Sequence, residues 1–311
     1  MKDILNLVGN TPLIELKSFS TQNARLFAKL EMFNPTCSIK DRIVLHILNQ
    51  ARQQELISPG ATIIEATSGN TGAALAMMGA ILGYKIILTT PEKTSRTKIS
   101  AMQAYGADVR VCPNSAKENE PEHYISLAKK LHATIPGSFM LNQYDNPANV
   151  EAHYLTTGPE IFTQMQGKID YLVACGSSGG TVTGVGKFLK EHIPALKIIM
   201  PDPIGSVYYS YFKTGKENKN HIQSYAVEGV GKDMICSCMD FSLLDDVVQF
   251  TDKHAFAMVK KLALQEGIFA GGSSGAALYV SDLIIKQSTK LINIVVVFPD
   301  SGLKYPEIIR P

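Results

Sequence analysis

Strand-like and helix-like segments alternate along the chain, and this alternation limits its possible folds more than any other feature. Residues 62–66 and 86–90 are short strand-like runs, and a longer helix-like segment follows each. Because parallel strands need a crossover that a helix usually supplies, the pattern predicts an α/β fold with mostly parallel strands. The same reasoning predicts further strands at 108–111, 169–175, 197–200 (ended by Pro201) and 293–298. It predicts helices at 71–82, 96–105, 121–133, 183–192 and 254–266, one that begins at about residue 147, and one that follows the turn at 271–275 and ends at residue 286. Residues 213–220 are predicted to form a loose surface loop.

Three turns rich in glycine, serine and threonine each precede a predicted helix. They span residues 67–72, 175–181 and 271–275. Small residues let a ligand approach the backbone, and the first N–H groups of a helix attract a carboxylate or a phosphate. In open α/β sheets such turns gather at the carboxyl ends of the strands, which predicts a ligand site there. Taken alone, each turn could equally be a tight connection or a helix cap.

The second turn is compatible with two functions. Its strand, loop and helix order describes a phosphate cradle, although neither the G-x-G-x-x-G spacing nor a Walker A loop is present. Residues 176–180 also match G-x-S-x-G, the turn that carries the nucleophile of many hydrolases. A serine hydrolase would use Ser178, with Asp202 as the acid and His221 or His254 as the base. That function would leave the other two turns without a role.

Lys40 follows a turn that puts it at the start of a helix. Asn34 and Pro35 favour a turn, because proline fixes its own φ and keeps the preceding residue out of the helical region. Ser38 can then cap a helix whose inward face is formed by residues 43, 44, 47 and 48. The positive end of the helix dipole disfavours a cation, so Lys40 has a reason to release its proton, and a neutral amine can form a Schiff base. A solvated Lys-Asp-Arg helix start is the simpler alternative.

The composition argues against several classes of function. The chain has 311 residues, enough for one large or two smaller domains, and a net charge of +2. Its basic residues are scattered, which argues against nucleic acid or an anionic membrane as a partner. No apolar run is long enough to cross a bilayer and no secretory signal is present, so we expect a cytoplasmic protein. Five unpatterned cysteines and seven scattered histidines predict neither a disulfide framework nor a metal site.

Several ordered motifs occur along nearly the whole chain. They are GNTPL at 9–13, SIKDR at 38–42, TSGNTG at 67–72, NQY at 142–144, NPAN at 146–149, TTGPE at 156–160, the Gly/Ser loop at 175–181 and GGSSG at 271–275. Together they resemble the pyridoxal-phosphate-dependent enzymes of the cystathionine β-synthase and cysteine synthase family, which has the tryptophan synthase β-like fold type II. The resemblance implies two α/β/α domains of three layers with mostly parallel sheets. Residues 1–42 plus 146–311 would bind the cofactor, and 43–145 would form a smaller, mobile domain.

The resemblance also implies a role for each matching residue. Lys40 would be the catalytic residue and would bind pyridoxal 5′-phosphate as a Schiff base, Asn70 would hydrogen-bond the ring hydroxyl, and Ser273 would face the ring nitrogen. The cofactor phosphate would contact Ser177, Ser178, Gly179, Gly180 and Thr181. The substrate would contact Thr67, Ser68, Gly69, Thr71, Gln143, Glu228 and Gly229.

Within this family, three stretches favour the cystathionine β-synthase branch, at 91–95, 202–206 and 227–233. The implied reaction is a β-replacement that condenses serine, or an O-activated serine, with homocysteine to give cystathionine. Two alternatives stay open: a cysteine synthase using O-acetylserine and sulfide, favoured by residues 157–160, and the serine hydrolase. The family further implies a homodimer acting on small amino-acid and thiol substrates, and we expect neither haem nor regulatory domains.

Two positions depart from the family pattern. Ser177 stands where the family usually has glycine, and a serine is tolerable there if its φ is negative. Lys232 stands where eukaryotic members often have tyrosine, which bears on how the second substrate is handled.

Overall fold

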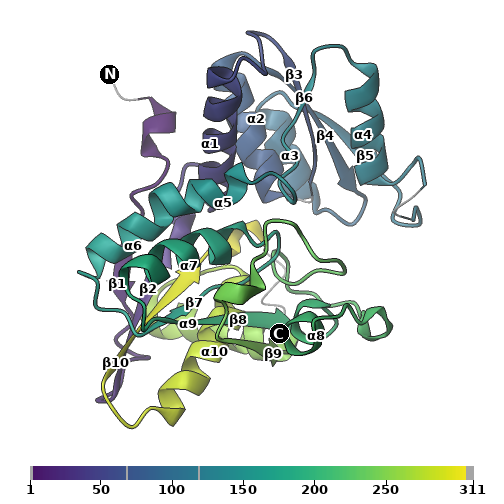
Figure 1. Ribbon diagram of the computed structural model, residues 1–311. Coiled ribbons are helices and arrows are strands. Elements are labelled where there is room, and N and C mark those ends of the chain that lie inside the picture. Colours follow the sequence, from purple (N-terminus) through teal and green to yellow (C-terminus); the bar gives the residue numbers. More distant parts are fainter. Residues whose placement is uncertain (1–2, 68, 118–119, 306–311) are drawn as a thin grey trace. The chain divides into compact units, whose positions relative to one another are not determined.

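The computed structural model describes residues 3–67, 69–117 and 120–305, and these residues form two compact units. The first unit comprises the segments up to residue 8 and 34–143, and the second comprises 9–33 and the chain from residue 144 onwards. Each unit has its own sheet (Figure 1). No helix in the described part of the chain is both long enough and apolar enough to cross a membrane.

The sheet of the first unit has four strands in the order β5-β4-β3-β6, and all neighbouring pairs are parallel. Figure 1 shows α1 and α2 on one side of this sheet and α4 on the other. The connections are right for parallel pairing, because a helix separates each strand from the next one in the chain. The elements are α1 (Lys40–Gln53), β3 (Thr62–Ala66), α2 (Asn70–Leu82), β4 (Lys85–Pro91), α3 (Arg96–Ala104), β5 (Asp108–Cys112), α4 (Tyr124–Thr134) and β6 (Phe139–Met140), with a 3-10 turn at Ile4–Leu7.

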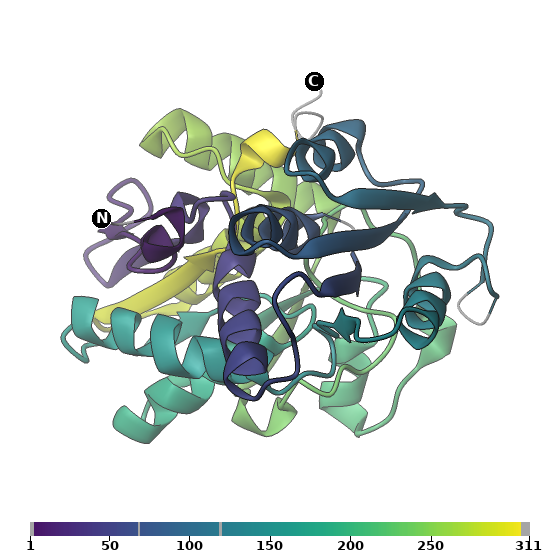
Figure 2. The ribbon, with the colours of Figure 1, turned by 90° about the horizontal axis from the view of Figure 1, so that it is seen from above.

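The sheet of the second unit has six strands in the order β1-β2-β10-β7-β8-β9. Only the β1–β2 pair is antiparallel. The strand β10 lies beside β2 although the two are at opposite ends of the chain (Figure 2, yellow and purple). The strands are β1 (Leu13–Glu15), β2 (Ala24–Leu30), β7 (Tyr171–Val173), β8 (Lys197–Pro203), β9 (Asp246–Phe250) and β10 (Ile292–Phe298).

Helices cover both faces of this second sheet. Figure 1 shows α6 and α7 on one face and α10 on the other, and α9 packs along α10. An irregular turn, a π-helical segment at His153–Thr157, joins α5 to α6 and also packs against α7. The helices are α5 (Ala148–Ala152), α6 (Gly158–Gln164), α7 (Gly180–His192), α8 (Tyr208–Thr214), α9 (Asp252–Glu266) and α10 (Gly272–Gln287), with 3-10 turns at Glu31–Phe33, Lys219–His221, Phe241–Leu243 and Gly302–Lys304.

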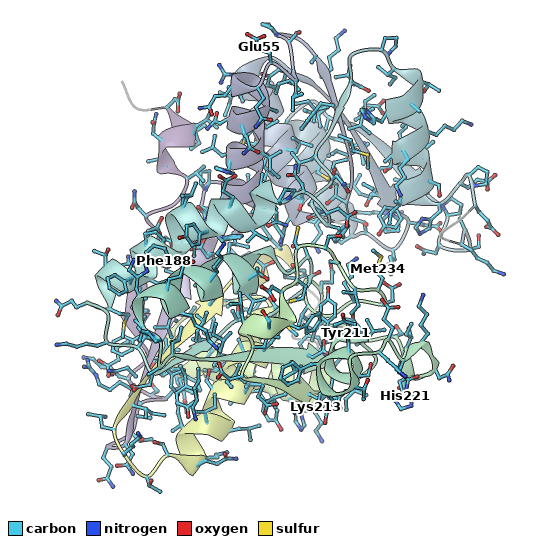
Figure 3. All side chains as sticks on the ribbon, viewed as in Figure 1. Glu55, Phe188, Tyr211, Lys213, His221 and Met234 are labelled. Atoms are coloured by element: carbon cyan, nitrogen blue, oxygen red, sulfur yellow. The ribbon has the colours of Figure 1, made fainter. Side chains whose placement is uncertain are left out.

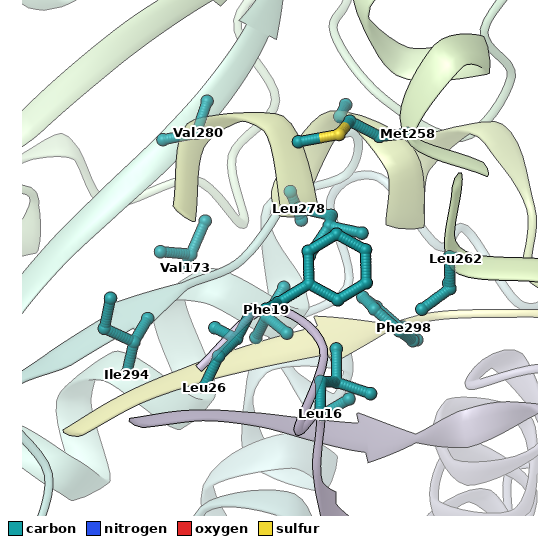
Figure 4. Close-up of a cluster of buried hydrophobic side chains, with 14 of the residues drawn as sticks. Leu16, Phe19, Leu26, Val173, Met258, Leu262, Leu278, Val280, Ile294 and Phe298 are labelled. Carbon is teal, nitrogen blue, oxygen red and sulfur yellow. The ribbon is translucent and has the colours of Figure 1, made fainter. Parts of the chain in front are cut away.

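The main core of the second unit lies between its sheet and the pair α9 and α10. Figure 4 shows Phe19, Leu278 and Phe298 at its centre, and all three side chains are buried. Removal of such apolar surface from water is the chief favourable term in folding. The core therefore fixes β10 and α10, and with them the third glycine-rich turn at the start of α10.

The predicted α/β fold with mostly parallel strands is confirmed, but two strand predictions are wrong in their limits. Pro201 does not end β8, which continues to Pro203 because the chain still pairs with β9, Pro201 lying opposite Val248. Proline lacks only the N–H donor, so its carbonyl is still available to the ladder. The strand predicted at 169–175 is limited to β7, since the chain leaves the sheet at Ala174 to enter the second turn. Sequence analysis also missed β1, β2, β6 and β9.

The helix predictions need three corrections. The helix predicted at 121–133 begins only at Tyr124, and the one predicted from 183 begins earlier, at Gly180. Glycine has a low helix propensity, so the glycines before residue 183 suggested loop. Gly179 is indeed a left-handed N-cap residue, but Gly180 is already the first residue of α7. The region predicted as a loose loop at 213–220 includes the end of α8 and the 3-10 turn Lys219–His221.

A buried ion pair links the N-terminal motif of the second unit to α6. The ammonium of Lys29 is fully buried and donates to the Glu160 carboxylate at 2.7 Å, to the Thr11 carbonyl at 2.8 Å and to Gln164 Oε1 at 2.9 Å. The Asn10 N–H donates to the same carboxylate at 2.9 Å. Lys29 of β2 therefore connects the GNTPL motif, through the Thr11 carbonyl, to Glu160 of the TTGPE motif, and the Asn10 N–H of GNTPL also bonds to that carboxylate.

Replacement of Lys29 by methionine is expected to lower the free energy of unfolding by about 3 to 5 kcal/mol, because Glu160 would keep a largely buried charge without its cation. Urea titration followed by circular dichroism measures this loss. Arg25→Met is the matched control: Arg25 and Glu15 are also 2.7 Å apart, but their side chains are 50% and 25% exposed. That pair is expected to contribute about 0 to 1 kcal/mol. Equal losses in the two variants would contradict the argument.

Candidate active site

Lys40 is the first residue of α1, as the sequence predicts for the start of this helix. The predicted inward face is confirmed, because Ile43, Val44, Ile47 and Leu48 are all buried. Ser38 is not the N-cap residue; that position belongs to Ile39, which has helical backbone angles. The Ser38 hydroxyl instead accepts a hydrogen bond from the Lys40 N–H at 3.3 Å.

The turn before Lys40 is fixed by the helix that follows it. The Cys37 N–H donates to the Asn34 carbonyl at 2.8 Å, and Cys37 has a left-handed φ of 58°. The fully buried carboxylate of Asp41 accepts from the Thr36 N–H at 2.7 Å and also from the Thr36 hydroxyl. A buried carboxylate needs such donors, and here they lock the turn to the helix. The backbone of Lys40 is thereby held in one position.

The first glycine-rich turn connects β3 to α2, and its threonine closes it. The Thr67 hydroxyl accepts from the N–H of Gly69 at 3.2 Å and from the N–H of Gly72 at 3.3 Å. Gly69 has a φ of 154° at the N-cap, and Asn70 begins the helix. Ser68 lies outside the described residues. The turn therefore presents backbone groups at the N-terminus of a helix of 13 residues, as an anion site requires.

Gln143 lies beside this turn although it is far away in the sequence. The Thr71 hydroxyl donates to Gln143 Oε1 at 2.6 Å, across 72 residues. The carboxylate of Glu65 accepts from the N–H groups of Asn142 at 2.9 Å and Gln143 at 3.3 Å, which holds this segment at the end of β3. Burial raises the pKa of Glu65 to about 7. The structure thus brings together two residues predicted to bind substrate, through a glutamate that sequence analysis did not identify.

Lys98 is a second residue near this turn that sequence analysis missed. It is on α3 and only 8% exposed, an unusual burial for lysine. A Cβ atom on Gly69 would lie 2.8 Å from Lys98 Cδ and 3.5 Å from its Nζ, so the ammonium is next to the turn. The sequence could have pointed to Lys98 through its position in the first turn of a predicted helix, where the helix dipole disfavours a cation.

The second glycine-rich turn connects β7 to α7 and offers several backbone donors. Among the described residues, the N–H groups of Ser177, Ser178 and Gly179 have no acceptor. Ser178 is 4% exposed, so water does not readily serve as the missing acceptor for its N–H. The φ of Ser177 is not positive, so a serine fits there without strain. Successive N–H groups that lead into a helix form an anion-binding nest.

Two side chains of the second turn are held by residues that sequence analysis did not single out. The Asn149 amide donates to the Ser178 hydroxyl at 3.0 Å, and His153 Nε2 lies 3.3 Å from the Thr181 hydroxyl. A Cβ on Gly180 would lie 1.9 Å from Asn149 Oδ1, so a larger residue there would displace the Asn149 amide that holds Ser178. His153 lies in the π-helical turn, a feature often found at functional sites.

These observations test whether the second turn fits the phosphate of the implied cofactor. The bare backbone, the acceptor-free N–H groups and the hydroxyls of Ser178 and Thr181 are the donors that a phosphate needs. All of them belong to one unit. The residues present therefore fit a phosphate group, and the first helical turn of α7 supplies the positive end of its dipole.

The third glycine-rich turn is the first turn of α10, which begins at Gly272. Ser273 is 3% exposed, and its backbone carbonyl accepts from the Cys175 thiol at 3.2 Å, which ties this turn to the second one. Burial raises the pKa of Cys175, so the thiol keeps its proton as the donor. The hydroxyl of Ser274 is buried and has no partner among the described residues. A buried hydroxyl without a partner is costly, and a polar ligand at this turn would satisfy it.

Glu228 and Gly229 lie in an exposed turn of the second unit, with Gly229 at a φ of 76°. The Gly231 N–H donates to the Gly176 carbonyl at 2.7 Å, which ties this segment to the second turn. The ammonium of Lys232 lies 4.0 Å from the centre of the Tyr144 ring, within the range of a cation–π contact.

The predicted hydrolase triad is not assembled. Ser178 bonds to Asn149, while Asp202 accepts from the Tyr209 N–H at 2.9 Å. His254 is part of the capping box of α9 and stacks on Tyr279 with 4.3 Å between ring centres. His221 is exposed (Figure 3). Each candidate therefore has a different structural role, and this geometry does not support a nucleophilic serine.

The chain is similar in sequence and in structure to known proteins. A family model described as "Pyridoxal-phosphate dependent enzyme" matches residues 4–300. Cystathionine beta-synthase of Apis mellifera is 43% identical over 98% of this chain, and the match covers 60% of that relative's length. O-acetylserine dependent cystathionine beta-synthase of Bacillus subtilis is 39% identical, with coverage of 97% of this chain and 95% of that one. The crystal structure of an O-ureido-L-serine synthase superimposes with a TM-score of 0.91 at 30% identity, covering 99% of this chain and 94% of that one.

Proposed function

Because this chain belongs to the family of pyridoxal-phosphate-dependent enzymes, we propose that it catalyses β-replacement on serine or an O-activated serine. The proposed acceptor is homocysteine and the proposed product is cystathionine. The observation that carries the proposal is the second turn, whose acceptor-free N–H groups fit the cofactor phosphate. The name of the Bacillus subtilis relative supports O-acetylserine as one donor to test.

We propose the following roles at the cofactor. Lys40 binds the aldehyde of pyridoxal 5′-phosphate, and the phosphate contacts Ser177 to Thr181. Asn70 hydrogen-bonds the ring hydroxyl and Ser273 faces the ring nitrogen. When bound, the cofactor withdraws electrons from the α-carbon of the substrate. A neutral serine hydroxyl leaves the ring nitrogen largely unprotonated, because it offers no negative charge to stabilise the extra proton.

We propose that the first turn binds the carboxylate of the amino-acid substrate. Thr67, Gly69 and Thr71 belong to the N-terminus of α2, and Gln143 is held beside them by Thr71. Ser68 completes this proposed set, and Glu228 and Gly229 are proposed for the second substrate. The Lys40 amine takes the α-proton and then donates a proton to the leaving group. Hydroxide leaves poorly, so serine as donor needs this proton more than O-acetylserine does.

Two further parts of the proposal concern organisation. Residues 43–145 are proposed as the smaller domain that closes over the substrate, since exclusion of water protects a reactive group during replacement. The enzyme is proposed to be a homodimer. Size-exclusion chromatography with light scattering tests the dimer, and a monomer that is fully active would overturn it.

Product analysis separates the proposed reaction from its alternatives. Purified enzyme is supplied with serine or O-acetylserine as donor and with homocysteine or sulfide as acceptor, and products are identified by mass spectrometry. The proposal expects cystathionine as the main product, whereas a cysteine synthase would make cysteine from O-acetylserine and sulfide at a higher kcat/KM. The name of the structural neighbour makes O-ureidoserine a third product to look for. A protein that never acquires cofactor absorbance would overturn the assignment altogether.

Ser178→Ala distinguishes the proposed function from a serine hydrolase. The substitution removes one neutral hydrogen bond, so cofactor affinity is expected to fall about three- to tenfold, with β-replacement retained at saturating cofactor. A nucleophilic serine would instead be indispensable. Titration of the cofactor-free variant, followed by an assay at saturating cofactor, measures both quantities. A wild-type protein that binds no cofactor but hydrolyses an ester, with that hydrolysis lost in Ser178→Ala, would favour the hydrolase.

A further inference from the structure

Tyr208 is a buried side chain whose hydroxyl donates to the backbone carbonyl of Ser177 in the second turn. Tyr208 is fully buried on α8, and its ring meets Phe241 edge-on at 5.6 Å between ring centres. Burial raises the pKa of Tyr208 far above its ordinary value, so the hydroxyl keeps the proton that it donates. Nothing in the local sequence of α8 indicates this contact, which spans 31 residues.

The contact fixes the direction of a peptide plane. The peptide bond is planar and trans, so the carbonyl of one residue and the N–H of the next point in opposite directions. With the Ser177 carbonyl directed to Tyr208, the Ser178 N–H is directed away from it. The preceding carbonyl, of Gly176, is held in the same manner by the Gly231 N–H at 2.7 Å. Two successive carbonyls are therefore tied down, and the N–H groups of Ser177 and Ser178 are left for a ligand.

We propose that Tyr208 is a positioning residue for the cofactor phosphate: by holding the Ser177 carbonyl, it keeps the Ser178 N–H aimed at the phosphate. This inference rests on the proposed function, since it takes the second turn as the phosphate site. Loss of the hydroxyl lets the Ser177–Ser178 peptide rotate and leaves a carbonyl of the turn without its donor. The effect concerns the phosphate and not the pyridine ring, because the peptide belongs to the phosphate turn alone.

Tyr208→Phe tests the proposal, with Tyr211→Phe as the matched control. Tyr211 lies on the same helix (Figure 3) and contacts the same Phe241 ring at 4.8 Å, but its hydroxyl makes no hydrogen bond among the described residues. The affinity of the cofactor-free protein is measured for pyridoxal 5′-phosphate and for pyridoxal, which lacks the phosphate. In Tyr208→Phe we expect the affinity for pyridoxal 5′-phosphate, divided by the affinity for pyridoxal, to fall about tenfold. The control is expected to keep the wild-type ratio.

Phosphorus NMR of the bound cofactor provides a readout that does not depend on turnover. We expect the phosphate resonance to shift in Tyr208→Phe and to stay in place in Tyr211→Phe. If Tyr208→Phe does not fold, 3-fluorotyrosine at position 208 keeps ring and hydroxyl but makes the hydroxyl a stronger donor, and the affinity ratio should then rise. An unchanged affinity ratio in Tyr208→Phe or in the 3-fluorotyrosine protein, or an equal loss of affinity for both ligands, overturns the proposal. Failure of the wild-type protein to bind either ligand would instead overturn the proposed function.

Discussion

Lys40→Ala is expected to abolish the visible absorbance of the bound cofactor and to lower turnover by about a thousandfold or more, because the variant lacks both the Schiff-base amine and the proposed proton carrier. Lys40 begins α1, and the buried carboxylate of Asp41 locks the turn before it, so the change removes an amine and leaves the backbone in place. Absorbance spectra with and without serine, together with product assays, measure the result.

Lys93→Ala is the control for this experiment. Lys93 is exposed and lies in the same unit, so its replacement should change neither the spectrum nor the turnover. Borohydride reduction of the wild-type enzyme followed by peptide mapping should place the cofactor on Lys40. Added ethylamine should restore part of the turnover of Lys40→Ala, since a free amine can replace the missing base. A cofactor tag on another lysine, or an active Lys40→Ala enzyme, would refute the assignment.

Gly179→Ala is expected to weaken cofactor binding by about a hundredfold, because it combines backbone strain with a collision in the phosphate turn. Gly179 has a φ of 94°, and an added Cβ would lie 2.6 Å from the Cα of Met239 and 2.7 Å from its backbone nitrogen. Backbone atoms cannot move aside as a flexible side chain can, so the turn itself must shift. Titration of the cofactor-free variant with pyridoxal 5′-phosphate measures the loss.

Gly267→Ala separates strain from collision. Gly267 ends α9 with a φ of 68°, and nothing lies within 4 Å of an added Cβ. Its replacement is expected to cost about 1 kcal/mol of stability through the left-handed backbone, with cofactor affinity unchanged. If Gly179→Ala bound the cofactor as well as Gly267→Ala does, the second turn would not be the phosphate site.

Local patterns were enough to predict several elements of the fold. The strand β3 has the predicted limits, and α2 begins one residue before its predicted start, because apolar runs and the glycine-rich turn between them are encoded in neighbouring residues. Where the structure departs from prediction, tertiary contacts override a local preference. Pro201 stays in β8 because β9 pairs with it, and α7 already begins at Gly180, which lies against the side chain of Asn149.

The candidate site, like the fold, has features that local sequence predicts and features that depend on tertiary contacts. The sequence by itself determined the alternation of strands and helices, the three glycine-rich turns and the place of Lys40 at the start of a helix, because each depends on residues within about one turn of each other. Only the tertiary structure decided which distant groups meet those turns. Gln143 reaches Thr71 across 72 residues, Tyr208 reaches Ser177 across 31, and Asn149 reaches Ser178 across 29. Such contacts follow from how helices pack on a sheet, and no local pattern of one sequence records that packing.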